Sequence, residues 1–353
     1  MASRDESQDA QESSSGHGAE GESTTAVLAA LAANLGIAVT KFVAWLLTGF
    51  SSMLAESIHS LADSGNQVLL LVGAKRARRP ADLDHPFGFG QQRYVYSFLV
   101  AIVLFVLGGL FALYEAYEKV RESLSEEDYD PFASRWWWVP LAVLGVAMVM
   151  EGLSFRTAVR ASNKVRDGRP WLRFVRGSKS PELPVVLLED SGALIGLVLA
   201  AAGVGLTLLT GNPVFDGIGS GLIGLLLVCV AAFLAVEMGS LLVGEAAGSR
   251  NRAAIIAALE SPTGVDRVIH SRTMHLGPDE VLVAAKVAVG ATDSAHDVAA
   301  AIDEAEAAAR AAVPDLTLVL YLEPDVDRTP GADSVDGPPW DRERRAAADQ
   351  REE

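Results

Sequence analysis

The chain has 353 residues, of which 50% are hydrophobic and 21% charged, and its formal net charge at pH 7 is −16. This acidic balance argues against a nucleic-acid partner, because binding phosphates needs clustered basic side chains. Cys229 is the only cysteine, which excludes a disulfide framework. The mean hydropathy of +0.26 fits soluble and membrane proteins alike, so the distribution of the apolar residues must decide between these classes.

Apolar stretches recur along the first two thirds of the chain. They lie near residues 24–48, 52–74, 94–118, 136–158, 182–210 and 213–243. Each is long enough to cross a hydrocarbon core about 30 Å thick as a helix. We therefore expect a polytopic α-helical integral membrane protein with six transmembrane helices, in a domain over residues 23–248.

The two ends of the chain are polar. Residues 1–22 are acidic and rich in Ser and Gly, and residues 326–353 combine Pro, Gly and mixed charges. Such compositions cannot bury enough apolar surface to fold, so we expect two disordered tails. The N-terminal tail has no apolar core of a cleavable signal peptide, which leaves the first transmembrane helix as the targeting signal.

The segment 249–325 predicts a small C-terminal α+β domain of α-β-β-α-β order, ferredoxin-like in its arrangement. Pro262 closes its first helix, and Ser294 is a suitable N-cap for the second. Alternating apolar residues predict the strands, and Gly277 with Pro278 marks the turn between the first two. The expected elements are helices at 249–262 and 294–313 and strands at 265–276, 280–289 and 316–323.

Basic residues are concentrated in two of the loops between the spans. Five lie at 75–93, after the second span, and eight lie at 156–179, after the fourth. The loop after the third span contains the acidic sequence ESLSEEDYDP. Positive charge is enriched on the cytoplasmic side of membrane proteins, so both basic loops, both termini and the α+β domain are expected in the cytoplasm.

Polar residues interrupt the second and fifth apolar spans. His59 and Asp63 are one helical turn apart, and Asp190 lies at a similar depth, roughly 12–16 Å from the same membrane surface at 1.5 Å per residue. A charge at the centre of a membrane helix costs about 2.5–3.5 kcal/mol, so such residues indicate function. Imidazole and carboxylate ligands suit zinc, and they also suit Mn, Fe(II), Co and Cd. The alternative is that these groups only pair with one another.

Other polar residues allow two interpretations. Lys41 and Glu56, in the first and second spans, are expected to form a structural ion pair. Asp82 and His85, in the loop after the second span, fit either a secondary metal site or a solvated turn ordered by Pro86 and the following glycines.

Two motifs together resemble a known family. Residues 56–63 read ESIHSLAD, and residues 78–94 read RRPADLDHPFGFGQQRY. With six spans and a small α+β domain, the chain resembles the cation diffusion facilitators along its whole ordered length. This resemblance implies a homodimeric secondary active transporter, not an enzyme, that exports a divalent metal, usually zinc, in exchange for protons. It implies no permanently bound cofactor.

The resemblance also assigns residues. His59 and Asp63 match the family's two ligands on the second helix, and Asp190 matches one of two on the fifth. The other would fall at Val186, which cannot bind a metal, so Glu189 or a water would complete the shell. The sequence LLED is similar to a branch near the mitochondrial and nuclear-receptor-linked zinc transporters, a zinc-transporter-9-like branch.

The resemblance extends to the loop and to the α+β domain. Asp82 and His85 match a secondary site of the family, while Phe89 replaces a histidine of some relatives. The α+β domain is expected to act in dimerisation.

Two other classes of function stay open. An intramembrane metalloenzyme would need a motif such as HExxH or GxSxG, and the chain has neither. A membrane scaffold would use its polar residues only for packing and would bind no metal. The Ala- and Arg-rich composition and the lack of a targeting segment favour a bacterial plasma membrane as the location.

Overall fold

The structure is a computed structural model that describes residues 34–123, 135–166 and 168–326. The predicted tail at 1–22 and all but the first residue of the tail at 326–353 lie outside these residues. The chain divides into two compact units. The first contains the residues before Arg76 together with Val95–Met238, and the second contains Arg76–Tyr94 together with the residues from Gly239 onward.

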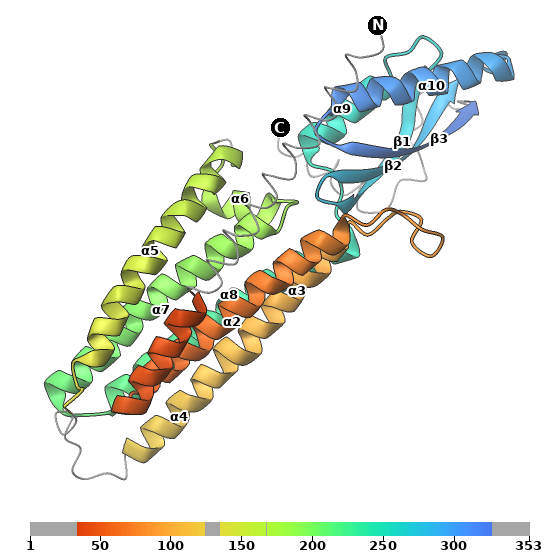
Figure 1. Ribbon diagram of the computed structural model, residues 1–353. Helices are drawn as coiled ribbons and strands as arrows, with labels where there is room; N and C mark the ends of the chain where they lie inside the picture. The colour runs from red at the N-terminus through yellow and green to blue at the C-terminus, as the bar shows by residue number, and fades with distance from the viewer. Residues whose placement is uncertain (1–33, 124–134, 167, 327–353) are drawn as a thin grey trace, which may run out of the picture. The chain divides into compact units, whose positions relative to one another are not determined.

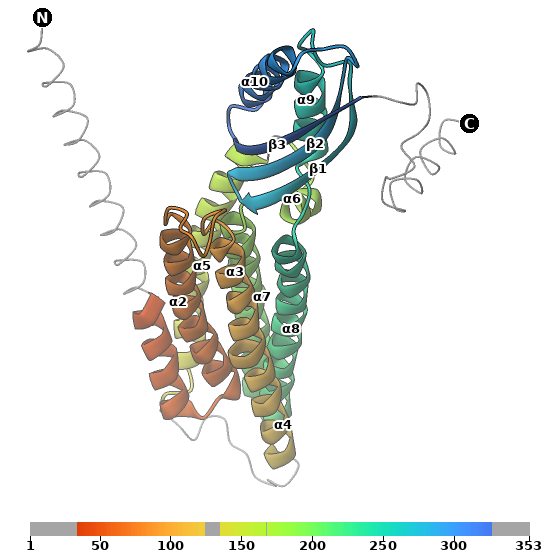
Figure 2. The same ribbon diagram turned by 90° about the vertical axis from the view of Figure 1, so that its right-hand side faces the viewer.

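The first unit is built from long helices (Figures 1 and 2). A helix over Asn34–Thr48 precedes them. The others are α2 (Ser51–Ala77), α3 (Gln92–Val103), η1 (Leu104–Leu110), α4 (Phe111–Ser123), α5 (Val139–Val165), α6 (Trp171–Gly177), α7 (Glu182–Thr210) and α8 (Val214–Val243). The π-helical turn η1 joins α3 and α4 into one continuous helix.

Four of the described helices are long and apolar enough to cross a membrane. They are Gln92–Ser123, Val139–Val165, Glu182–Thr210 and Val214–Val243. α2 has 27 residues, which is about 40 Å at 1.5 Å per residue, and it carries the polar residues that lower its hydropathy. The expected membrane fold is thus confirmed. The short helix α6 was not expected, because the sequence predicts only a basic loop there.

Glycines let the helices of this unit approach closely. A Cβ at Gly224 of α8 would lie 2.8 Å from the backbone nitrogen of Leu113 in α4, and one at Gly217 would lie 2.8 Å from a Val120 methyl. Both distances are too short for a side chain. The glycine-rich sequence GIGSGLIG at 217–224 therefore serves helix packing, as small residues do in membrane bundles.

α2 begins at a carboxylate that comes from α8. Asp216 Oδ2 accepts hydrogen bonds from the backbone N–H of Ser51 (2.6 Å) and from its hydroxyl (2.9 Å). Oδ1 accepts from the N–H of Ser52 (3.3 Å) and from its hydroxyl. Asp216 is fully buried. It accepts hydrogen bonds from N–H groups at the start of α2 that have no partner within the helix.

The second unit contains the α+β domain in the predicted order. Its elements are α9 (Ser249–Leu259), β1 (Arg267–Gly277), β2 (Glu280–Val289), α10 (Ala295–Ala312) and β3 (Thr317–Val326). β2 is the central strand, antiparallel to β1 and parallel to β3. Both helices cover one face of the sheet (Figure 2). Ser294 caps α10 in a capping box with Asp297, as expected for its N-cap.

The loop between α2 and α3 packs on the turn between β1 and β2, within the second unit. A Cβ at Gly90 would lie 2.6 Å from the carbonyl oxygen of Leu276, so only glycine fits this approach. Arg93 of α3 lies 3.6 Å from Asp279 in the same turn. The sequence FGFG superficially resembles a phosphate-binding loop. These contacts instead explain its last glycine by backbone packing.

We expect the Asp216→Ala substitution to lower the free energy of unfolding by at least about 2 kcal/mol, because four donors lose their acceptor in a buried place. Thermal unfolding of the detergent-solubilised protein measures the loss. Glu122→Ala, at an exposed acid of α4, is the matched control. Equal stability of the two variants would contradict the capping role.

Candidate metal-binding site

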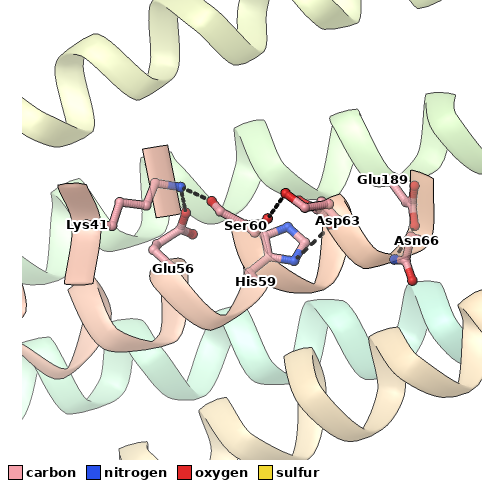
Figure 3. A network of polar contacts seen from close by, with 8 residues as sticks. Lys41, Glu56, His59, Ser60, Asp63, Asn66 and Glu189 are labelled. Carbon is pink, nitrogen blue, oxygen red and sulfur yellow. Dashed lines mark hydrogen bonds and ion pairs between the residues drawn. The ribbon is translucent and has the colours of Figure 1, made fainter. Parts of the chain in front are cut away.

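Four polar side chains form a row along α2. Glu56, His59, Asp63 and Asn66 follow one another at intervals of three, four and three residues, which places them on one face of the helix (Figure 3). Glu56 and Asn66 are fully buried, and His59 and Asp63 expose 1% and 16% of their side chains. The row faces other helices of the first unit.

Each member of this row has a buried polar atom with no hydrogen-bond partner among the described residues. These atoms are Glu56 Oε1, His59 Nδ1 and Nε2, Asp63 Oδ1 and Asn66 Oδ1. His59 Nδ1 lies 3.6 Å from Asp63 Oδ1, which is too long for a hydrogen bond. An unsatisfied buried group costs about 1–3 kcal/mol. A divalent cation would satisfy the ring nitrogen and the carboxylate together.

Lys41 occupies one end of the row. Its Nζ lies 2.9 Å from Glu56 Oε2 and donates to Ser60 Oγ at 2.8 Å, and neither charged side chain is more than 1% exposed. The structure therefore contains the ion pair that the sequence suggests. Because Lys41 forms an ion pair with Glu56, its positive charge is partly neutralised. The ammonium group lies at the end of the row and not between His59 and Asp63.

Glu189 of α7 occupies the other end. Its Oε1 accepts a hydrogen bond of 2.7 Å from Asn66 Nδ2, and the side chain is 6% exposed. The neighbouring Asp190 points to another helix and accepts from Ser154 Oγ of α5 at 3.0 Å. Successive residues are about 100° apart around a helix, so the two acids reach different neighbours.

In the structure, His59 therefore lies beside Asp63, and Glu189 contacts the α2 row. Asp190 instead contacts α5. In the part of the chain that the structure describes, no group of three or more His, Cys, Asp or Glu side chains surrounds one point closely enough to hold a metal. Val186, at the position where the family resemblance implies a ligand, contributes to the apolar core. Closing a shell around one ion with Asp190 would need a shift of α7 relative to both α2 and α5.

Sequence reasoning missed Glu151 of α5. Glu151 lies one turn before Ser154, so it shares the face that reaches Asp190, and it interacts electrostatically with Asp63, His59 and Asp190. Figure 1 shows α5 and α7 side by side. A lone acid in an apolar span was the available signal.

The loop residues Asp82 and His85 do meet. Asp82 Oδ1 accepts from the backbone N–H of His85 (2.7 Å) and of Asp84 (3.0 Å), and it lies 3.1 Å from His85 Nδ1. These bonds, first of all the one from the His85 backbone, lower the pKa of the Asp82 carboxyl. The His85 ring packs on Phe89 at 4.3 Å between centroids. The geometry is that of an Asx-turn, and the described residues supply no third ligand.

The fold defines an α-helical integral membrane protein with a row of buried polar side chains inside its bundle. The cation efflux transmembrane domain matches residues 27–243, more than half of the chain. The chain therefore belongs to the cation efflux family, the cation diffusion facilitators that its motifs resemble.

Named relatives refine this assignment. The chain is 33% identical over 250 residues to the mitochondrial proton-coupled zinc antiporter SLC30A9 of Xenopus laevis, which covers 70% of this chain and 43% of the antiporter. It is 30% identical over 258 residues to metal tolerance protein C4 of Arabidopsis thaliana, covering 72% and 55% of the two chains. Magnetosome protein MamM of Magnetospirillum gryphiswaldense is 24% identical over 282 residues, with 78% and 80% covered. The predicted zinc-transporter-9-like branch is confirmed, although the chain spans less than half of the zinc antiporter.

Glu189→Gln and Asp190→Asn distinguish the roles of the two adjacent acids. The amide oxygen of a glutamine could still accept the hydrogen bond from Asn66, so Glu189→Gln removes charge without removing the contact. If Glu189 only orients Asn66, we expect the affinity for zinc to fall less than about tenfold, against about 100-fold or more for Asp190→Asn as a ligand. Isothermal titration of the detergent-solubilised protein with zinc measures both. Equal losses would make Glu189 a ligand, and a larger loss for Glu189→Gln would reverse the assignment.

Proposed function

We propose that this protein is a proton-coupled antiporter that exports a divalent cation, with zinc as the leading candidate. The observation that carries the proposal is the buried pair of His59 and Asp63 in α2, whose ring nitrogens and Oδ1 have no hydrogen-bond partner among the described residues. Membership of the cation efflux family supports it, as does the similarity to proton-coupled zinc antiporters. Mn, Fe(II), Co and Cd accept a similar ligand set and are the alternative substrates.

The proposed ligands are His59, Asp63 and Asp190, with Glu189 as the candidate for the fourth position. We infer that α7 moves relative to α2 and α5 and carries Asp190 from Ser154 to the metal. The ion pair between Lys41 and Glu56 keeps one end of the α2 row fixed during this movement, whereas the hydrogen bond from Asn66 to Glu189 rearranges with α7. Glu151 interacts electrostatically with Asp63 and Asp190 and is a further carboxyl group near the proposed site.

Coupling to protons follows from competition for the same atoms. Metal binding needs His59 neutral and the carboxylates ionised, so each proton that binds displaces metal. Zinc affinity is therefore expected to fall as the pH falls. Alternating exposure of such a site to the two sides converts an inward proton gradient into outward metal movement.

Transport in proteoliposomes tests this function. Under an imposed pH gradient, we expect Asp63→Asn and Asp190→Asn to abolish zinc transport, because each loses a charged ligand but keeps its shape. The thermal stability of both variants should hold or rise, since a buried charge disappears. His59→Asp should retain transport but shift it towards manganese, because oxygen replaces nitrogen.

Normal zinc transport by both Asn variants would overturn the shared site. Wild-type protein that binds no metal would instead favour a scaffold whose polar residues only pack. Hydrolysis of a peptide or lipid ester without metal exchange would favour a metalloenzyme.

We further propose that both termini and the α+β domain lie in the cytoplasm of a bacterial cell, in the plasma membrane. The basic loops at 75–93 and 156–179 support this orientation. The proposal includes a homodimer, to which the α+β domain would contribute.

Cysteine labelling measures the orientation. Cys229 is exposed, so it is first replaced by Ser. In that background, we expect a cysteine at position 125 to react with an impermeant maleimide in intact cells and one at position 335 to react only after lysis, because the basic loops hold the opposite side inside. The reverse pattern would contradict the orientation.

A further inference from the structure

An apolar groove lies on the first unit, among α5, α6, α7 and α8. Its volume is about 440 Å³, within the range of about 300–1,000 Å³ that small-molecule sites occupy. Phe155 of α5, Trp171 and Leu172 of α6, Leu187 of α7 and Phe233 of α8 line it. Ser191 is the polar residue of its lining, and the Ser191 hydroxyl donates to the carbonyl of Leu187 at 2.6 Å. The groove therefore presents almost wholly apolar surface.

The helix α6 forms one wall of this groove and is amphipathic in a particular way. Phe174 and Val175 are buried against α5 and α7, at 2% and 8% exposed. Trp171 and Leu172 are 38% and 59% exposed although both are large and apolar. Arg173 is also exposed, so one short helix presents apolar and cationic surface side by side. Such a combination is typical of a helix that lies in the membrane interface.

Cationic groups border the groove. Between residues 156 and 180 the chain has eight basic residues and one acidic residue, Asp167. The Arg166 guanidinium lies 4.4 Å from the centroid of the Trp171 ring, and the Arg176 guanidinium lies 5.8 Å from that of Phe233. Both rings line the groove, so the basic rim and the apolar wall are continuous.

Two of these arginines donate hydrogen bonds to nearby backbone carbonyls and to the side chain of Asn163. Arg166 donates to Asn163 Oδ1 and to the carbonyl of Arg169, at 2.6 and 2.8 Å. Arg169 donates to the carbonyls of Arg166 and Val165, at 2.9 and 3.2 Å. Each guanidinium has five N–H groups, so three remain on each for another acceptor. Arg176 differs, because it lies 3.6 Å from Glu237.

We propose that this groove binds an anionic phospholipid, with an acyl chain against the apolar wall and the phosphate on Arg166, Arg169 and Arg173. The guanidinium fork matches a phosphate in geometry and charge. In a zwitterionic lipid, the cationic group of the headgroup partly cancels the negative charge of the phosphate. Basic pockets between transmembrane helices bind anionic headgroups in this manner. A bound chain would contact the turn of α7 that carries Asp190, because Leu188 and Ser191 line the groove on either side of it.

Native mass spectrometry of the full-length protein tests this site with two probes that differ only in the headgroup, phosphatidylglycerol and phosphatidylcholine of the same chains. We expect wild-type protein to retain at least about tenfold more phosphatidylglycerol, because the arginines favour net negative charge. The triple variant Arg166→Gln, Arg169→Gln, Arg173→Gln should lose this preference. The matched control is Arg76→Gln, Arg78→Gln, Arg79→Gln, which removes as many charges from the other basic loop and should keep it.

A second variant tests the apolar wall without touching the charges. Val159→Trp places a large side chain in the groove and should reduce retention of both lipids. Monodisperse elution and an unchanged helical signal show that each variant is folded. Equal retention of the two lipids by wild type, an equal loss in both charge variants, or full retention by Val159→Trp would each overturn the proposal. The readout is binding, so it stands apart from whether the protein transports zinc.

Discussion

The polar face of α2 can be buried in an apolar bundle only where other helices supply partners for it. A carboxylate and an ammonium group that leave water together cost several kcal/mol each unless they meet closely. The structure provides this contact at Lys41 and Glu56, at 2.9 Å. A second contact fixes the opposite end of the row, from Asn66 to Glu189, and Asp216 binds the first N–H groups of the helix. α2 is therefore held at its start and at both ends of its polar row.

The centre of the row has no such contact with the residues that the structure describes. His59 and Asp63 lie 3.6 Å apart, and three of their buried polar atoms have no hydrogen-bond partner there, whereas both ends of the row are bonded. Such an arrangement is unfavourable for a protein whose only task is to be stable, because each unsatisfied group lowers stability. It suits a protein whose ligand supplies the missing partner. This contrast between satisfied ends and an unsatisfied centre is the strongest structural argument for a cation site.

α5 and α7 form the other half of the arrangement. Asp190 accepts a hydrogen bond from Ser154, and Glu151 lies one turn before Ser154, so acidic side chains collect where α5 and α7 meet. The groove beside α6 is lined by residues adjacent to Asp190, so lipid bound there would press on the helix that carries a candidate ligand. The proposed metal site and the proposed lipid site thus share one turn of α7.

The sequence by itself determined the features that depend on local pattern. Span length and apolar content predicted the membrane helices, strand alternation and Ser294 predicted the α-β-β-α-β order, and two motifs indicated the family. Spacing also placed His59 and Asp63 on one face of α2, because the helical period is fixed. The turn formed by Asp82 and His85 is also local, because the hydrogen bond between them spans only three residues.

The tertiary structure alone decided which distant groups meet. Whether Glu189 or Asp190 faces α2 depends on the rotation of α7 about its axis, which hydrophobicity cannot fix when most of the helix is apolar. The partners Asp216 and Ser51 are 165 residues apart, so no local pattern reveals the cap. Glu151 was equally hidden, because an acid in an apolar span gains its meaning only from the helices packed around it. Local sequence sets the period of a helix, whereas its packing sets which side chains share one buried space.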